Sequence, residues 1–432
     1  MFDSYVMSKS SQSACKVSDD GVESEQSQAN EMSWFRDQVV FLTGGTGGLG
    51  GCLVYKLALQ LPTQQIFVLC RTSKERAIAR WKETMPTNFE SILATGKIIF
   101  IVGDMTQPNY GISNDDLKRL WTEATIILNC AANKSFTTNA YEAVTENCLP
   151  VLNLAKMASK FSRLVKFIHI STAYVSSFLP DGVVLERSYD PPTCHQCPEE
   201  ELSHILSEGS TPSTAKFAWP GAQAKHLADE LLISRYPSLP IILIRPSFMG
   251  PAIQHPYPLY DPTSTNPFTV LTELYLLDGG GDRVWHTLPG QRSATNIFDE
   301  VPIDLVANVI LLHTMLQTKG IVHACAQLHV QCTGDEYIAR AKRHVPLFLR
   351  KKRSCFKFSE DLSIPQCLFA ELYRIGTRDW RFDCSRSKHL KEVQGALTLN
   401  LDEHSFEEYI EKRMKEIIDR IPLALEPGTS KL

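Results

Sequence analysis

The sequence predicts an α/β protein, with a doubly wound parallel-sheet Rossmann domain and a smaller C-terminal lobe of mixed α/β structure. Two observations favour this fold class. From Gln38 onward, short runs rich in β-branched residues alternate with segments of helical pattern, which is typical of a parallel sheet covered on both faces. The first of these runs leads directly into the glycine-rich stretch Thr43–Gly50, as the first strand of a Rossmann domain does.

Six runs have the composition of buried strands. They are residues 39–44, 65–70, 97–103, 124–130, 165–171 and 239–246. Helical patterns lie between them, at Gly48–Gln60, Asp115–Trp121, Ala140–Phe161 and Ala222–Arg235. This alternation is what a doubly wound sheet requires, and beyond Arg245 it stops.

The composition divides the chain into three parts. Residues 1–33 hold nine serines, six acidic residues and two lysines, so we expect a disordered tail. Residues 34–250 form the predicted Rossmann domain, with a polar insertion at 180–220. Residues 251–432 form the predicted substrate-binding and C-terminal helical region, and we expect residues 299–316 to pack back on the Rossmann core. In that segment Asp304 is expected to cap or brace a helix.

The remaining composition favours a cytoplasmic protein that acts on a small molecule. No run reaches the roughly 18 apolar residues of a membrane span, and no signal peptide precedes the domain. No basic stripe interleaved with aromatic residues suggests a nucleic-acid partner. The pair Cys194 and Cys197 has metal-ligand spacing, but a second matched pair is missing. We therefore expect a plain loop there and no metal.

The glycine-rich stretch TGGTGGLG predicts a dinucleotide site. Gly44, Gly47 and Gly50 have Gly-x-x-Gly-x-x-Gly spacing, which allows a tight turn, close approach of the pyrophosphate and close helix–strand packing. Because this stretch lies between the first strand and the first helix, a mere flexible turn is the less favoured interpretation. The predicted contacts are Thr43, Gly44, Thr46, Gly47, Gly48, Leu49 and Gly50.

The ends of the following strands indicate which dinucleotide binds. Arg71 follows the second strand, where an NAD site prefers an acid, and a guanidinium there suits the 2′-phosphate of NADPH. We therefore predict NADPH, although a solvated basic turn would give the same pattern. The other predicted cofactor contacts are Asp104, Met105, Cys130, Ala131, Ala132, Asn147 and Pro246.

These motifs together resemble a known family, the extended short-chain dehydrogenase/reductases. Within them the chain is most similar to the fatty acyl-CoA reductase or male-sterility type and its thioester-reductase relatives. The matching stretches are TGGTGGLG, GDMTQPNYGIS, NCAANKSF, ENCLPVLNLA, FIHISTAYV, LIRPSFMGPA and DEVPIDLVANVIL. They cover about residues 38–315 in the right order. The resemblance implies that a thioester or aldehyde carbonyl accepts hydride from NADPH.

The resemblance also implies catalytic roles for particular residues, and one of them is missing. Thr172, with Ser171 beside it, matches the hydroxyl that holds the carbonyl oxygen. Lys225 matches the lysine that binds the ribose. The tyrosine that should donate the proton lies four residues before that lysine, where this chain has Gly221. The loss matters because a placed general acid contributes roughly 10²–10⁴-fold to the rate.

Three functions remain open for such a chain. It is either an NADPH-dependent reductase with atypical proton donation, or a redox-neutral isomerase or cyclase, or a non-catalytic NADPH-binding protein. We favour the reductase, acting on the thioester or carbonyl of a bulky or long-chain substrate that is CoA- or carrier-linked. We expect Gly221 to leave a phenol-sized space at the nicotinamide, with Trp219 and Phe248 lining the substrate pocket.

Overall fold

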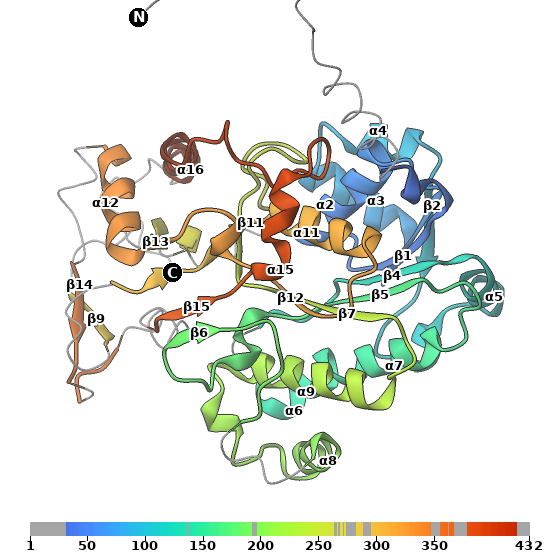
Figure 1. Ribbon diagram of the computed structural model, residues 1–432, viewed down its shortest axis with the longest axis horizontal. Helices are drawn as coiled ribbons and strands as arrows, with labels where there is room; N and C mark the ends of the chain where they lie inside the picture. The colour runs from blue at the N-terminus through green and yellow to red at the C-terminus, as the bar shows by residue number, and fades with distance from the viewer. Residues whose placement is uncertain are drawn as a thin grey trace, which may run out of the picture.

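A computed structural model gives the arrangement of these segments (Figure 1). It describes residues 32–135, 138–191, 197–262, 266, 268–270, 272–273, 282–287, 295–346, 355–361, 363–366 and 378–420. The predicted disordered tail, apart from its last two residues, lies outside this range. Cys194 of the possible metal pair also lies outside it.

The centre of the molecule is a seven-stranded parallel sheet in the order β12-β7-β5-β4-β1-β2-β3. Its strands are β1 Val39–Thr43, β2 Gln65–Cys70, β3 Ile98–Val102, β4 Ile126–Asn129, β5 Lys166–Ile170, β7 Ile241–Pro246 and β12 Gly320–Ala324. The first six are the six predicted strands. The fold class is therefore confirmed as a doubly wound Rossmann sheet.

The seventh strand, β12, is a correction to the sequence analysis, which ended the alternation at Arg245. It pairs in parallel with β7, with Ile321 opposite Leu243. The strand is short and contains His323, which is fully buried and whose Nδ1 lies 2.8 Å from the Asp383 carbonyl oxygen. A short run with a polar residue inside is not recognisable as a central strand until its tertiary partner is known.

Helices cover both faces of the sheet, and each face has its own apolar core (Figure 1). One face carries α2 Gly48–Tyr55, α3 Lys74–Thr84, α4 Phe89–Ala94 and α11 Ile303–Met315. The other carries α5 Asn114–Glu123, α6 Ala140–Asn147, α7 Leu149–Ala158 and α9 Pro220–Arg235. The predicted helix Ala140–Phe161 is divided at Cys148, because Pro150 in the first turn of α7 has no N–H to continue α6.

The predicted insertion at 180–220 joins distant parts of the chain. It contains β6 Gly182–Val184 and α8 Pro198–Glu208. Helix α8 packs beside α6 and α9. Strand β6 pairs in parallel with β15 Trp380–Phe382, from the C-terminal third. The insertion therefore connects the Rossmann domain to the C-terminal region.

The C-terminal region adds a mixed α/β lobe at one end of the sheet (Figure 1). Its elements include β9 Asp282–His286, β10 Ile297–Phe298, β13 Cys332–Thr333, α12 Gly334–His344, β14 Cys355–Ser359 and α16 Phe406–Arg420. Two further strands, β8 Phe248–Gly250 and β11 Glu300–Pro302, pair in parallel where this lobe meets the sheet. Segment 299–316 contributes α11, which packs against α2.

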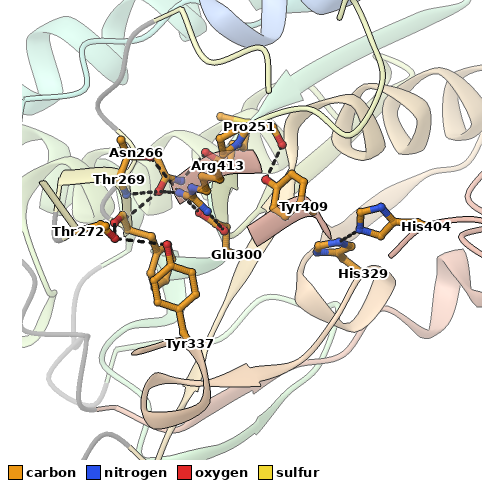
Figure 2. Close-up of polar contacts among 12 residues, drawn as sticks. Pro251, Asn266, Thr269, Thr272, Glu300, His329, Tyr337, His404, Tyr409 and Arg413 are labelled. Atoms are coloured by element: carbon orange, nitrogen blue, oxygen red, sulfur yellow. Dashed lines mark hydrogen bonds and ion pairs between the residues drawn. The ribbon is translucent and has the colours of Figure 1, made fainter. Parts of the chain in front are cut away.

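A buried polar network fixes α16 to the rest of the lobe (Figure 2). Arg413 is 2% exposed, and its guanidinium donates to both carboxylate oxygens of Glu300 at 2.7 and 3.0 Å. The same guanidinium donates to Asn266 Oδ1 at 2.9 Å and Thr269 Oγ1 at 3.0 Å. These charge-assisted bonds satisfy most of the arginine's donors, which indicates a structural role.

None of the helices in the described part of the chain has the length and apolar character that a membrane span needs.

Candidate functional site

The glycine loop forms the turn between β1 and α2 that its spacing predicts. Gly44 has φ +74°, and a Cβ there would lie 2.7 Å from the Ala131 nitrogen. A Cβ on Gly50 would lie 2.1 Å from the Gly44 carbonyl oxygen. Gly47 is exposed, and its N–H donates to the Gly44 carbonyl at 2.9 Å. Glycine is required at positions 44 and 50 because any side chain there would collide with backbone.

This turn leaves the start of α2 suited to a phosphate. The helix begins at Gly48, and its N-cap, Gly47, has no side chain to bond the first-turn N–H groups. Those groups and the positive end of the helix dipole attract an anion. Thr46 is half-buried beside them, whereas Leu49 is buried against the core. The cradle fits the pyrophosphate of a dinucleotide.

A hydrogen-bonded chain joins this loop to the end of β4. The Ala131 N–H donates to Thr43 Oγ1 at 3.2 Å, and Thr43 Oγ1 donates to Asn129 Oδ1 at 2.7 Å. Cys130, Ala131 and Ala132 follow β4 and are half-buried. Burial raises the pKa of the Cys130 thiol to about 12, so it stays neutral. The structure thus brings the predicted contacts from β1 and β4 together.

Asn147 supports the segment that follows Ala132. It is the last residue of α6 and is 5% exposed, and its Oδ1 accepts from the Asn133 N–H at 2.8 Å. Asn147 therefore holds the backbone beyond β4, and this bond uses one of its side-chain acceptor positions.

Arg71 and Asp104 lie side by side at the end of β2 and β3. The register pairs Cys70 with Val102, and Arg71 follows as an exposed residue. Hydrogen bonds from the N–H and hydroxyl of Thr106 lower the pKa of Asp104, with a smaller contribution from the charge of Arg71. Met105 beside it is half-buried. The Asp104 carboxylate accepts hydrogen bonds from Thr106 within its own turn. Arg71 is exposed to solvent, so its guanidinium is accessible to an anionic group.

Ser171 and Thr172 point to opposite sides of the chain after β5, because the backbone there is extended. Thr172 is half-buried, and its hydroxyl donates to the Pro246 carbonyl at 3.4 Å. The Ser171 hydroxyl instead donates to Asp229 Oδ2 at 2.9 Å, in the interior. The structure therefore places Thr172, and not Ser171, on the accessible side.

Lys225 reaches the same strand end from α9. Its Nζ donates to the carbonyl of Ile170, the last residue of β5, at 2.7 Å. Burial lowers the pKa of Lys225 to about 8, and the charge of Asp229 opposes this shift. The hydroxyl of Thr172 and the ammonium of Lys225 are thus brought together at one end of one strand, as the sequence predicts.

The space beside Gly221 is bounded by Trp219. A Cβ on Gly221 would lie 3.2 Å from Cδ1 and 3.3 Å from Nε1 of Trp219. The indole would have to move by a few tenths of an ångström to admit such a Cβ. The ring of Tyr174 lies 5.5 Å from that of Trp219 and 4.8 Å from that of Phe248. Trp219 and Phe248 are both half-buried.

Sequence reasoning missed a buried cluster behind these residues. Asp229, Arg245 and His169 are each at most 1% exposed. An ion pair joins Arg245 NH2 to Asp229 Oδ2 at 2.9 Å, and His169 Nδ1 lies 3.1 Å from Asn129 Nδ2. The available signal was the spacing of Asp229, which is four residues after Lys225 and so on the same face of α9.

Metal ligands do not gather anywhere in the described ranges: no group of three or more His, Cys, Asp or Glu side chains is placed to hold an ion there.

Comparison with known proteins relates this site to others. The NAD-binding family model described as male sterility protein matches residues 42–310. Fatty acyl-CoA reductase 1 of Arabidopsis thaliana is 25% identical over 325 residues, which cover 66% of this chain and 64% of that protein. This chain therefore spans less than two thirds of that relative's length.

Two solved structures share the fold. The terminal R domain from the myxalamid PKS-NRPS biosynthetic pathway is 17% identical with a TM-score of 0.63, covering 90% of this chain and 92% of its own. Gre2 from Candida albicans in complex with NADPH is 13% identical with a TM-score of 0.56, covering 88% and 99%. These structural similarities show the fold alone, whereas the family model also shows the family. Since it spans well over half of the chain, the protein belongs to the NAD-binding male sterility family and has the site of a nicotinamide cofactor.

Proposed function

We propose that this protein is an NADPH-dependent reductase that acts on the thioester of a bulky or long-chain acyl group. The observation that carries the proposal is the meeting of Thr172 and Lys225 at the end of β5, where Lys225 Nζ lies 2.7 Å from the Ile170 carbonyl oxygen. The fatty acyl-CoA reductase among the relatives supports an acyl thioester as substrate.

The choice of NADPH over NADH rests on Arg71. Its guanidinium is exposed directly after β2 and lies close to Asp104. A planar guanidinium binds a phosphate through two parallel hydrogen bonds. In a Rossmann domain the residue at this position contacts the 2′ position of the adenosine ribose. Arg71 therefore favours the cofactor that carries a phosphate there.

The side chains have separate tasks in this reaction. Bound NADPH supplies a hydride to the carbonyl carbon. The hydroxyl of Thr172 donates a hydrogen bond to the carbonyl oxygen and stabilises the negative charge that develops on it. The ammonium of Lys225 binds the ribose and adds positive charge at the same strand end.

Thioester reduction also explains how the site works without the tyrosine. Hydride addition to a thioester gives an oxyanion that expels the thiolate, so the C–S bond breaks and the C=O bond forms again. The products are an aldehyde and a thiolate, and the thiolate takes a proton from water to give the thiol. Reduction of an aldehyde or ketone instead leaves the charge on oxygen, where a proton must be delivered. The residues present at the end of β5 suit the first reaction better than the second.

The leaving thiol belongs either to CoA or to the phosphopantetheine arm of a carrier protein. The relatives include a fatty acyl-CoA reductase, and the fold neighbours include a terminal R domain of a PKS-NRPS pathway. Both sources present the same thioester chemistry to Thr172 and Lys225. The substrates in the test therefore include a long-chain acyl-CoA and the matching acyl-pantetheine.

The test measures three quantities in one reaction of the full chain: NADPH consumed, thiol released and aldehyde formed. We expect them in equal amounts. Thr172→Val should lower kcat by about 10²-fold with little effect on NADPH affinity, since it removes an oxyanion donor. Lys225→Met should lower both kcat and the affinity for NADPH. Thr145→Val is the matched control, because this half-buried threonine on α6 donates to the Glu142 carbonyl of its own helix.

Other outcomes contradict the proposal, and two of them indicate the other functions that the missing tyrosine leaves open. Conversion of substrate without net NADPH consumption would indicate a redox-neutral isomerase or cyclase. Tight NADPH binding with no turnover would indicate a non-catalytic binding protein. NADPH consumption without release of thiol would indicate a carbonyl reductase.

A further inference from the structure

The carboxylate of Asp229 joins three elements behind the candidate site. Asp229 lies on α9 and is fully buried. Its Oδ2 accepts from Arg245 Nε at 3.0 Å and Arg245 NH2 at 2.9 Å, on β7. The same oxygen accepts from Ser171 Oγ at 2.9 Å, directly after β5. A buried guanidinium requires an ionised partner, so these contacts keep Asp229 charged and fix its position.

The other carboxylate oxygen faces a histidine whose tautomer the structure determines. The Ala131 N–H can only donate to Thr43 Oγ1, so the Thr43 hydroxyl donates to Asn129 Oδ1. Asn129 Nδ2 therefore donates to His169 Nδ1 at 3.1 Å, and the ring proton resides on Nε2. Burial holds the pKa of His169 well below its usual value. Nε2 lies 3.9 Å from Asp229 Oδ1.

Asp229 is also the nearest opposite charge on the helix that carries Lys225. The two residues are four apart, so their side chains lie on one face of α9. Burial lowers the pKa of Lys225 to about 8, and Asp229 is the largest influence in the opposite direction. The other charged or titratable neighbours of the pair are Cys130, Lys134, Cys148, His169, Glu230 and Arg245.

We propose that Asp229 is the positioning residue for Lys225: bonded to Arg245 on β7 and to Ser171 directly after β5, its carboxylate holds α9 against the end of β5, where Lys225 Nζ contacts the Ile170 carbonyl. This inference rests on the proposed function for the role of Lys225 in binding the ribose. It explains why Ser171 faces the interior, since its hydroxyl orients Asp229.

The test follows NADPH affinity against pH, from about pH 6 to pH 9.5, without any substrate. In the wild type, affinity should fall as Lys225 loses its proton near pH 8. Lys225→Met should abolish this transition, which separates it from the titration of Lys134. Asp229→Asn removes the charge that favours the ammonium, so the midpoint should move down by about one pH unit. Asp229→Glu keeps the charge and should restore most of the wild-type midpoint.

A second variant covers the case in which Asp229→Asn does not fold, because it leaves the buried Arg245 unpaired. The double variant Asp229→Asn/Arg245→Gln removes both charges. Because the loss of the like charge of Arg245 offsets part of the effect, its midpoint should still fall, but by less than one pH unit. A wild-type midpoint in either folded variant would overturn the inference, and so would an unchanged pH profile in Lys225→Met. The readout needs no turnover. Failure of the wild type to reduce thioesters would therefore contradict the proposed function alone.

Discussion

Arg71 is an exposed side chain with one strong chemical consequence. It follows β2, and its charge is near enough to lower the pKa of Asp104. If its guanidinium binds the 2′-phosphate, the wild type should bind NADPH at least about tenfold more tightly than NADH, or ~1.4 kcal/mol. Arg71→Ala should remove most of this difference in fluorescence titrations. Arg76→Ala, a nearby exposed cation on α3, is the control and should preserve it. Equal affinities in the wild type would contradict the assignment.

Mutations at Gly221 test whether the space beside Trp219 is used by the substrate. Gly221→Ala places a Cβ 3.2 Å from the indole, so Trp219 need move only a few tenths of an ångström and thioester activity should fall little. Gly221→Tyr must displace the indole. We expect it to obstruct the native substrate and to increase the reduction of a small aldehyde to its alcohol, since the phenol supplies a proton donor.

A double variant tests whether the indole limits that rescue. Trp219→Ala combined with Gly221→Tyr gives the phenol room, so the yield of alcohol from a small aldehyde should exceed that of Gly221→Tyr alone. Native activity that remains unchanged in Gly221→Tyr would show that this side of α9 does not contact the substrate.

At the scale of elements, Asp304 joins α11 to the loop that lies over the cofactor helix. Its carboxylate accepts from the N–H groups of Ile253, Gln254 and His255 at 3.1, 2.8 and 3.2 Å. The same loop reaches α2 through the Tyr260 hydroxyl, which donates to the Gly48 carbonyl at 3.2 Å. Asp304 therefore braces this loop from the first turn of its own helix. It does not cap that helix, whose N-cap is Pro302, so the role expected from the sequence is corrected.

Replacing Asp304 should loosen that loop. Asp304→Ala removes the charged acceptor of three loop N–H groups, which should cost about 1.5–3 kcal/mol of unfolding free energy in denaturant titrations. Asp304→Asn keeps one acceptor oxygen and should cost less. Asp335→Ala, in the exposed first turn of α12, is a surface control. An Asp304→Ala protein as stable as the control would show that the loop does not depend on these bonds.

At the scale of the whole molecule, several buried histidines predict sensitivity to acid. Burial lowers their pKa, to about 3 for His226 and about 4 for His313 and His323. In the unfolded chain a histidine binds a proton near pH 6.5. Below that pH the histidine binds a proton in the unfolded state but not in the folded state. Each histidine therefore lowers the unfolding free energy by about 1.4 kcal/mol per pH unit.

Buried carboxyls act in the opposite direction: burial raises the pKa of Asp299 and also those of Glu186, Asp229, Glu230 and Glu273. The pKa of Asp299 rises to about 6, so its protonation stabilises the folded state as the pH falls. We expect the histidines to outweigh these carboxyls. We therefore expect a clearly lower Tm at pH 5.5 than at pH 7.5, measured calorimetrically. His226→Phe should make this dependence shallower, because His226 packs between Phe178 and Phe217 and a phenyl ring suits that site. A Tm that is equal at the two pH values would contradict the prediction.

The sequence by itself determined six strands, which are β1 to β5 and β7. It also determined the glycine loop and the places of Thr172 and Lys225 in the chain. These features depend on residues close together in the chain: apolar periodicity, turn-forming glycines and short motifs. Tertiary structure alone decided that β12 joins the sheet, that Ser171 bonds Asp229 and that Trp219 lies close against Gly221. Ser171 and Asp229 are 58 residues apart, and no local pattern links them. Which of the two hydroxyls is buried depends on which side of β5 packs against α9, and that is determined only when the two elements meet.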